Sequence, residues 1–107
     1  MGEDRLSIKL QALADPTRRA MLAKLVLGEA TVNELAQPFA MSLPAISKHI
    51  KVLQQAGLIT RSRHAQQRPC RLSFDGLKEV DDWMKAYRDV WEDRLDRLES
   101  YLQTIKE

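Results

Sequence analysis

The sequence predicts a mainly α-helical single domain that carries one small β-hairpin. Apolar residues recur at helical spacing in five separate segments, and most of these segments begin at a residue that can cap a helix. Two short extended segments, 59–64 and 69–74, flank a polar tetrapeptide and predict the hairpin. The chain has 107 residues, a length that fits one compact domain.

The first two helices are predicted over residues 4–14 and 16–27. Leucines recur at helical spacing in the first segment, namely Leu6, Leu10 and Leu13. The pair Asp15-Pro16 indicates the start of the second helix, because Asp can cap the free amide groups and Pro suits the first turn. Gly28 ends this helix. Its buried face is expected to hold Met21, Leu22, Leu25 and Val26.

A helix–turn–helix arrangement is predicted over residues 31–56. The stretch Thr31–Glu34 has the pattern of a capping box, in which each side chain bonds the other residue's amide group, and it begins a short third helix. After a tight turn at Ala40-Met41, Ser42 can cap a fourth helix with Pro44 in its first turn. The fourth helix is amphipathic, with a buried stripe formed by Ile46, Ile50 and Leu53. Its outer face holds small or hydrogen-bonding residues: Ala45, Ser47, Lys48, His49 and Lys51.

Basic residues gather in this part of the chain, although the net charge is only +2. Residues 35–74 contain six Lys and Arg residues and no Asp or Glu. A forty-residue stretch without a carboxylate predicts a surface that faces a polyanion. Uneven charge can also arise by chance, so the decision depends on the elements that hold these residues.

The basic residues of the hairpin have different expected positions. Arg61 and Arg63 are expected to share one strand face, because side chains alternate along a strand, and Arg68 lies at the hairpin tip. Arg71 can instead pair with a carboxylate of the last helix, and His64 is ambiguous.

Together these elements predict a winged helix-turn-helix domain that binds DNA. In such domains the second helix of the pair enters the major groove, and small residues let its backbone approach the bases. The basic hairpin has the size of a wing that lies along the phosphate backbone or the neighbouring minor groove. The residues predicted to contact DNA are Ser42, Leu43, Ala45, Ser47, Lys48, His49, Lys51, Arg61, Arg63 and Arg68.

Some of these residues have structural alternatives. His49 can pack on the turn before the helix, and Ser42 can serve only as a cap. Lys48 and Lys51 can be solvated lysines without a partner. A protein-interaction module without DNA binding is the competing function, but it would favour acidic or apolar residues on the outer face of the fourth helix. No glycine-rich phosphate loop and no nucleophile with a nearby base indicates an enzyme.

A last helix is predicted from a cap at Asp75 to near residue 107. Its apolar residues follow steps of three and four, as in a coiled-coil seam: Leu77, Val80, Met84, Tyr87, Trp91, Leu95, Leu98, Leu102 and Ile105. A helix of about 30 residues, or about 45 Å, extends past a domain of this size, so its far end needs an apolar partner. We therefore expect a homodimer whose interface includes Leu6, Leu10, Leu77, Met84, Tyr87, Trp91, Leu95, Leu98 and Leu102.

The polar face of the last helix is acidic. We interpret its carboxylates as a solvated face with i,i+4 ion pairs, Asp81 to Lys85 and Asp93 to Arg97, rather than as a Ca²⁺ or Mg²⁺ site. Trp83, Tyr87 and Trp91 can line an effector pocket at the dimer interface, but we favour ordinary interface packing for these side chains. The sequence names no effector.

The chain resembles the arsenic-repressor (ArsR) type of winged-helix regulators over almost its whole length. The resemblance rests on the stretches LADPTRR (13–19), TVNELA (31–36), SLPAISKHIKVL (42–53) and QAGLI (55–59). It implies a dimer built from the first and last helices, residues 1–14 and 75–107. It also implies that the fourth helix contacts operator DNA beside a wing at 59–74, that the protein represses its own operon, and that an inducing signal releases the DNA.

Metal sensing is where the sequence departs from many relatives. The best-known metal-sensing members have a Cys-x-Cys pair in the third helix, whereas the equivalent stretch here, 34–39, has neither Cys nor His. Residues 75–107 contain no His. We therefore expect no metal and no cofactor, as in the subgroup without metal-binding cysteines. The lone Cys70 is expected to be half-buried and inert, in a cytoplasmic protein without a membrane span.

Overall fold

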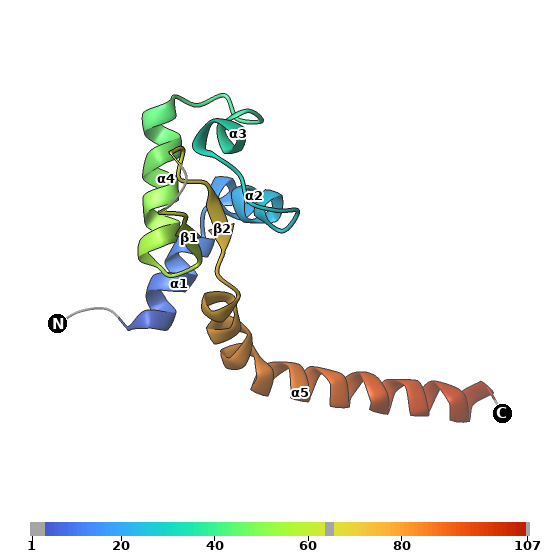
Figure 1. Cartoon of the computed structure of the whole chain (residues 1–107). Helices are drawn as coiled ribbons and strands as arrows, with labels where there is room; N and C mark the ends of the chain where they lie inside the picture. Colours follow the sequence, from blue (N-terminus) through green and yellow to red (C-terminus); the bar gives the residue numbers. More distant parts are fainter. Residues whose placement is uncertain (1–3, 64–65, 107) are drawn as a thin grey trace.

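The computed structural model describes residues 4–63 and 66–106. The described elements are helices α1 to α5 with a two-stranded hairpin between α4 and α5 (Figure 1). This confirms the predicted fold class, a mainly α-helical winged helix-turn-helix domain. In chain order the elements are α1 (Arg5–Leu13), α2 (Pro16–Leu25), α3 (Val32–Ala36), α4 (Leu43–Gln55), β1 (Ile59–Arg61), β2 (Cys70–Leu72) and α5 (Phe74–Lys106).

The predicted helix caps decide where α2, α3 and α4 begin. The Asp15 carboxylate accepts a hydrogen bond from the Arg18 amide at 3.0 Å, and this bond lowers the pKa of Asp15. The capping box of Thr31 and Glu34 is complete, with both side-chain-to-amide bonds formed. Ser42 caps α4. All three predicted caps are therefore confirmed.

The predicted cap of the last helix was wrong by two residues. Helix α5 begins at Phe74, and the Ser73 hydroxyl accepts a hydrogen bond from the Gly76 amide at 3.3 Å. Asp75 therefore lies inside the first turn, where its negative charge favours the helix N-terminus without capping it. This earlier start seats Gly76 directly on the turn before β1: an added Cβ would lie 1.9 Å from the backbone oxygen of Gly57.

The core lies where α1, α2, α3 and α4 meet the hairpin. The predicted stripe of α4 is buried, and the core also includes Met21, Leu35, Leu58, Ile59 and Cys70. Val26 was wrongly predicted to be buried. Helix α2 ends at Leu25, so Val26 caps the helix end and is 69% exposed.

The hairpin holds Cys70 at its centre. Strands β1 and β2 pair antiparallel, and Arg61 faces Cys70. On its other side Cys70 exchanges two backbone hydrogen bonds with Ala30, at 3.0 and 2.7 Å. Cys70 is fully buried rather than half-buried, and burial raises the pKa of its thiol. The thiol is therefore kept in its unreactive protonated form.

The first turns of α5 pack against the rest of the domain. Leu77, which the sequence assigned to a dimer interface, packs against the core of its own subunit. Glu79 accepts from Lys9, whose Nζ lies 2.9 Å away and which is only 3% exposed, and it also pairs with Arg5. The hydrogen bond from Lys9 lowers the pKa of Glu79.

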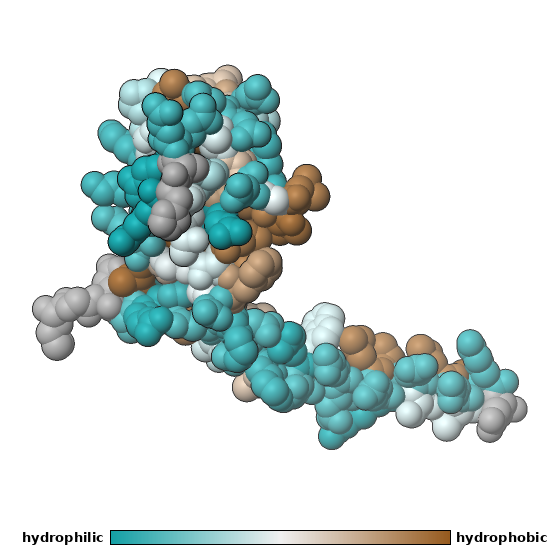
Figure 2. Space-filling view, viewed as in Figure 1, coloured by the Kyte–Doolittle hydropathy of each residue, from teal (hydrophilic) through white to brown (hydrophobic). Residues whose placement is uncertain are grey.

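Beyond residue 80, α5 leaves the domain entirely, and we call residues 81–106 the overhang. Every residue of the overhang is exposed, and the described chain extends 64 × 37 × 25 Å. Apolar side chains gather along one edge of it (Figure 2). Within residues 4–63 and 66–106, each helix is too short or too polar to span a bilayer.

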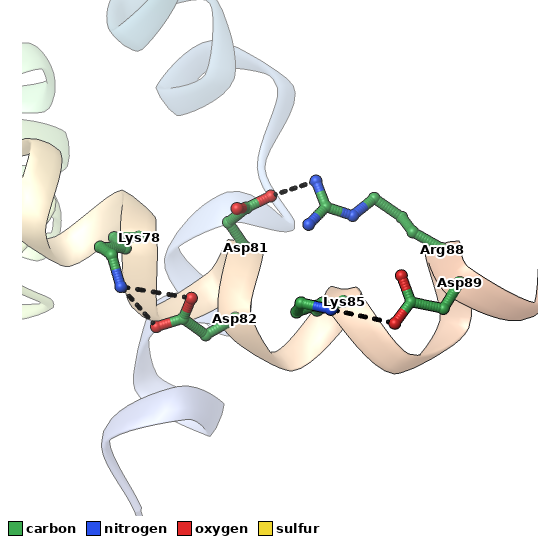
Figure 3. Close-up of polar contacts among 6 residues, drawn as sticks. All are labelled: Lys78, Asp81, Asp82, Lys85, Arg88 and Asp89. Atoms are coloured by element: carbon green, nitrogen blue, oxygen red, sulfur yellow. Dashed lines mark hydrogen bonds and ion pairs between the residues drawn. The ribbon is translucent and has the colours of Figure 1, made fainter. Parts of the chain in front are cut away.

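Ion pairs cover the polar face of the overhang and of the turn before it (Figure 3). Asp93 pairs with Arg97 at 3.1 Å, as predicted. Asp81 was wrongly assigned to Lys85: it pairs with Arg88 at 2.8 Å, two turns along, while Lys85 pairs with Asp89 at 3.0 Å. Because these pairs are exposed, each contributes only a few tenths of a kcal/mol, about 0.3–0.5.

Candidate nucleic-acid interface

The outer face of α4 presents most of the residues predicted to contact DNA. It lies opposite the buried stripe of Ile46, Ile50 and Leu53. The exposed residues are Ser42, Leu43, Ser47, Lys48 and Lys51, while Ala45 is half-buried. Proline at the second helical position removes no helical hydrogen bond, and Ser42 satisfies the Ala45 amide at 3.3 Å. The N-terminal turn of α4 is thus a capped end that projects from the domain.

His49 lies at the edge of this face and not at its centre. The side chain is half-buried, and its Nδ1 lies 3.2 Å from a guanidinium nitrogen of Arg18 on α2. Neither of the two roles predicted for His49 included this contact. Arg18 was missed because nothing local in the sequence indicates which helix its side chain crosses to.

Arg18 also holds the end of α1 in place. Its Nε donates to the Ala12 carbonyl at 2.7 Å, and its second terminal nitrogen donates to the Gln11 carbonyl at 3.1 Å. Carbonyls in the last turn of a helix lack the amide partners of the helix interior, and the Gln11 carbonyl also accepts from the Ala14 amide at 3.1 Å. One guanidinium therefore joins α1, α2 and α4. The only sequence signal for this contact is an arginine two residues after Pro16, at the start of a helix that Asp15 caps.

Some arginines of the wing form contacts within the domain, and others are exposed. Arg61 is half-buried and its Nε donates to the Arg68 carbonyl at 3.0 Å, which joins the two arms of the hairpin. Strand β1 ends at Arg61, so the alternation that placed Arg61 and Arg63 on one face does not extend to Arg63. Arg63 and Arg68 are both exposed. For Arg71 the sequence left open a partner on the last helix, and the structure pairs it instead with Glu29, between α2 and α3, at 3.4 Å.

The free cations of this region lie on two neighbouring elements. Lys48 and Lys51 on α4 and Arg63 after β1 are exposed and form no ion pair within residues 4–63 and 66–106. No carboxylate belongs to residues 35–74, so nothing within this stretch neutralises them. His64, to which no role was assigned, lies outside the described residues. The surface therefore combines positive charge, an accessible helix end and exposed hydroxyl groups.

Comparison with known proteins identifies the family. The family model described as a helix-turn-helix domain matches residues 13–62. The chain is 36% identical over 74 residues to the transcriptional repressor SdpR of Bacillus subtilis, covering 69% of this chain and 82% of SdpR. It is 42% identical to a crystal structure of an ArsR family transcriptional regulator, with a TM-score of 0.75, covering 83% of this chain and 98% of that chain. The chain belongs to the ArsR family.

Two further similar proteins are also described as transcriptional regulators. The chain is 43% identical over 67 residues to the HTH-type transcriptional regulator Rv2034 of Mycobacterium tuberculosis, and the match covers 63% of each chain. A crystal structure of a possible transcriptional regulator for arsenical resistance is 38% identical, with a TM-score of 0.67, covering 92% of this chain and 96% of that one. The ArsR family consists of transcriptional regulators and is not an enzyme class, which agrees with the function predicted for this chain.

The described residues of this ArsR member contain no group of three or more His, Cys, Asp or Glu side chains that could hold a metal ion. In α3, where the resemblance places the thiols of metal-sensing members, the buried residue is Leu35.

Proposed function

We propose that this ArsR-family chain is a homodimeric repressor that binds operator DNA of its own operon. The observation that supports DNA binding is the outer face of α4, where Ser47, Lys48 and Lys51 are exposed beside a capped helix end. A helix of this kind fits the major groove with its N-terminal turn at the base edges.

The roles of individual residues follow from their exposure. Ser42 and Ser47 lie at or near the first turn and can bond to base edges or phosphates, while Ala45 and Leu43 allow a close approach. Lys48 and Lys51 neutralise phosphates and release counterions. From the wing, Arg63 and Arg68 are free to contact the backbone. Arg61 acts within the hairpin, so we place it in a supporting role.

Dimerisation is proposed to use the overhang. Its exposed apolar stripe consists of Met84, Tyr87, Trp91, Leu95, Leu98, Leu102 and Ile105. Burying an apolar side chain of this size contributes about 1.5–3 kcal/mol. No part of residues 4–63 and 66–106 covers these side chains. Leu6 and Leu10 on α1 lie outside the core cluster and extend the proposed interface, whereas Leu77 does not. A two-fold symmetric dimer predicts an operator with two half-sites about 34–36 Å apart.

Fluorescence anisotropy tests the proposal. The purified chain is titrated into the DNA upstream of its own gene and into a scrambled duplex, each at two salt concentrations. We expect tighter binding to the upstream DNA and affinity that falls steeply with salt. The matched control is Lys78→Ala, which removes an exposed lysine paired with Asp82 on α5 and is expected to change nothing. No binding at low salt would contradict the proposal and favour a protein-interaction module.

A further inference from the structure

The contact between Arg18 and His49 constrains the proton on the imidazole ring. A guanidinium has five N–H donors and no acceptor, and it stays protonated in proteins. The 3.2 Å contact to Nδ1 is a hydrogen bond only if Nδ1 accepts and so carries no proton. A neutral imidazole then carries its single proton on Nε2.

Other hydrogen bonds hold the Arg18 guanidinium in place, so it can determine which ring nitrogen of His49 carries the proton. Its other nitrogens are bonded to the Ala12 and Gln11 carbonyls at 2.7 and 3.1 Å. Arg18 therefore cannot turn away to let Nδ1 become a donor without giving up bonds to α1.

We propose that Arg18 is a positioning residue that holds His49 in the Nε2–H tautomer, so that the recognition helix presents a hydrogen-bond donor to a purine N7 in the major groove. This rests on the DNA binding proposed above. The two ring nitrogens of histidine point in widely different directions, so Nε2 is directed away from Arg18. Within the described residues no hydrogen bond occupies Nε2. Purine N7 is an acceptor on both adenine and guanine, and a donor N–H is its complement.

Nitrogen-15 NMR of the imidazole tests the tautomer without any DNA. At about pH 8, where an unperturbed histidine is neutral, the protonated and bare ring nitrogens have separate chemical shifts. We expect His49 to be almost entirely the Nε2–H form in the native chain and a mixture in Arg18→Ala. The matched control is Arg19→Ala, because Arg19 donates to the Leu13 carbonyl at 2.7 Å and therefore also anchors α1. That variant is expected to keep the native tautomer.

Operator duplexes with single 7-deazapurines test the acceptor. These analogues replace N7 by a carbon and leave the base pair intact. One substitution per half-site is expected to weaken binding of the native chain about tenfold, and to have no effect on His49→Ala. The penalty should persist in His49→Gln, whose amide is also a donor, and should shrink in Arg18→Ala but not in Arg19→Ala.

The outcomes separate this inference from the proposed function. An Nδ1–H tautomer or an imidazolium in the native chain overturns the inference even if DNA binding is strong. Equal 7-deaza penalties in the native chain and His49→Ala also overturn it. Failure to bind any duplex, with the Nε2–H tautomer present, rejects the proposed function and leaves the tautomer assignment standing.

A different observation supports a second proposal, concerning an exposed apolar patch on the domain. Val26, Leu27 and Phe74 are 69%, 89% and 74% exposed, and they lie at the end of α2 and the start of α5. Beside them is an open cavity of about 450 Å³ with a mixed lining, apolar at Leu25, Leu72 and Phe74 and polar at Thr60 and the Glu29–Arg71 ion pair. Figure 2 shows apolar atoms at the α2 end and along the overhang on the same side of the molecule, with an open angle between them.

We infer that the last turns of the partner subunit's α5 cover this patch in the proposed dimer. Two-fold symmetry can pair the α5 helices antiparallel, and full overlap covers the whole apolar stripe. In that arrangement the C-terminal end of each helix faces the first turn of the other, next to Phe74. Leu102 and Ile105 are exposed near that end and supply the apolar surface that the patch lacks.

Cysteine cross-linking tests this inference. In the double variant Leu27→Cys, Ile105→Cys, mild oxidation is expected to give a covalent dimer that a reductant reverses. The native Cys70 is fully buried and does not interfere. The control pairs Ile105→Cys with Gln37→Cys, an exposed position after α3, and is expected to give no cross-link. A dimer by sedimentation without the Leu27–Ile105 cross-link overturns the inference, whereas a monomer rejects the proposed homodimer itself.

Discussion

Residues 4–80 and the overhang are both largely helical, but they differ in how their apolar residues are covered. In the first region, the inward faces of α1 to α4 and the hairpin bury one another around Met21, Leu35 and Leu53. In the overhang the apolar residues are just as regular in spacing, yet all of them are exposed. The comparison shows that helical periodicity predicts an apolar face but not the surface that covers it. We propose that a second subunit covers the overhang.

The largest expected effect comes from placing a charge on the apolar stripe of the overhang. Leu95→Asp is expected to raise the dimer dissociation constant at least about a hundredfold, because a carboxylate in an apolar interface is left unpaired. DNA affinity should fall with it. Sedimentation velocity measures the dimer, and circular dichroism shows that residues 4–80 stay folded. Ser100→Asp adds the same charge on the opposite helix face and should leave the dimer intact; equal effects of both variants would contradict the account.

A leucine-to-alanine substitution in residues 4–80 and another in the overhang should have different effects on stability. Leu53→Ala removes a fully buried side chain and is expected to lower the free energy of unfolding by about 2–5 kcal/mol. Urea denaturation at two protein concentrations measures it. The loss should be similar at both concentrations for Leu53→Ala, whereas Leu102→Ala should cost stability mainly where the dimer forms. A concentration-independent loss for Leu102→Ala would mean that the overhang folds back on its own subunit.

The junction between the two regions should respond to pH. The hydrogen bond from Lys9 lowers the pKa of Glu79, so the folded chain binds this proton less readily than the unfolded chain. The stabilisation is therefore complete above the ordinary carboxyl range and is lost as the pH falls through the lowered pKa. Denaturant midpoints measured down the acidic range should fall less steeply for Glu79→Gln than for the native chain. If the denaturant midpoints of the native chain and Glu79→Gln fell equally steeply with pH, Glu79 would not be the cause of the acid sensitivity.

The smallest effects concern exposed cations. Arg63→Ala is expected to weaken DNA binding similarly for all sequences and to reduce the slope of log affinity against log salt by about 1. Lys85→Ala, on the overhang, removes a cation paired with Asp89 and should leave the slope unchanged. Anisotropy titrations over a range of salt measure both slopes. An equal change for the two variants would mean that overall charge, and not the wing, sets the affinity.

The sequence predicted local features well because their causes are local. The caps at Asp15, Thr31 and Ser42 need partners only three residues away, and the buried stripe of α4 follows from helical spacing. The order of helices and the position of the hairpin follow from these signals. The outer face of α4 was predicted for the same reason.

The errors at Asp75 and Val26 concern the exact end of a helix, whereas the missed side-chain contacts join distant segments. Arg18 with His49, Arg71 with Glu29 and Lys9 with Glu79 join residues whose meeting depends on how the helices pack. The charge of a side chain does not say which of several oppositely charged or polar side chains it will contact. The missed pairing of Asp81 has a related cause, because long flexible side chains on one helix face have more than one partner within reach.

Hydroxyl-radical footprinting on the bound operator tests the central claim most directly. If two subunits joined through their overhangs each place an α4 in the major groove, the native chain should protect two symmetric half-sites about one helical turn, or 34–36 Å, apart. Leu95→Asp should lose this paired protection. A single protected half-site, or a paired footprint that persists in Leu95→Asp, would contradict the account.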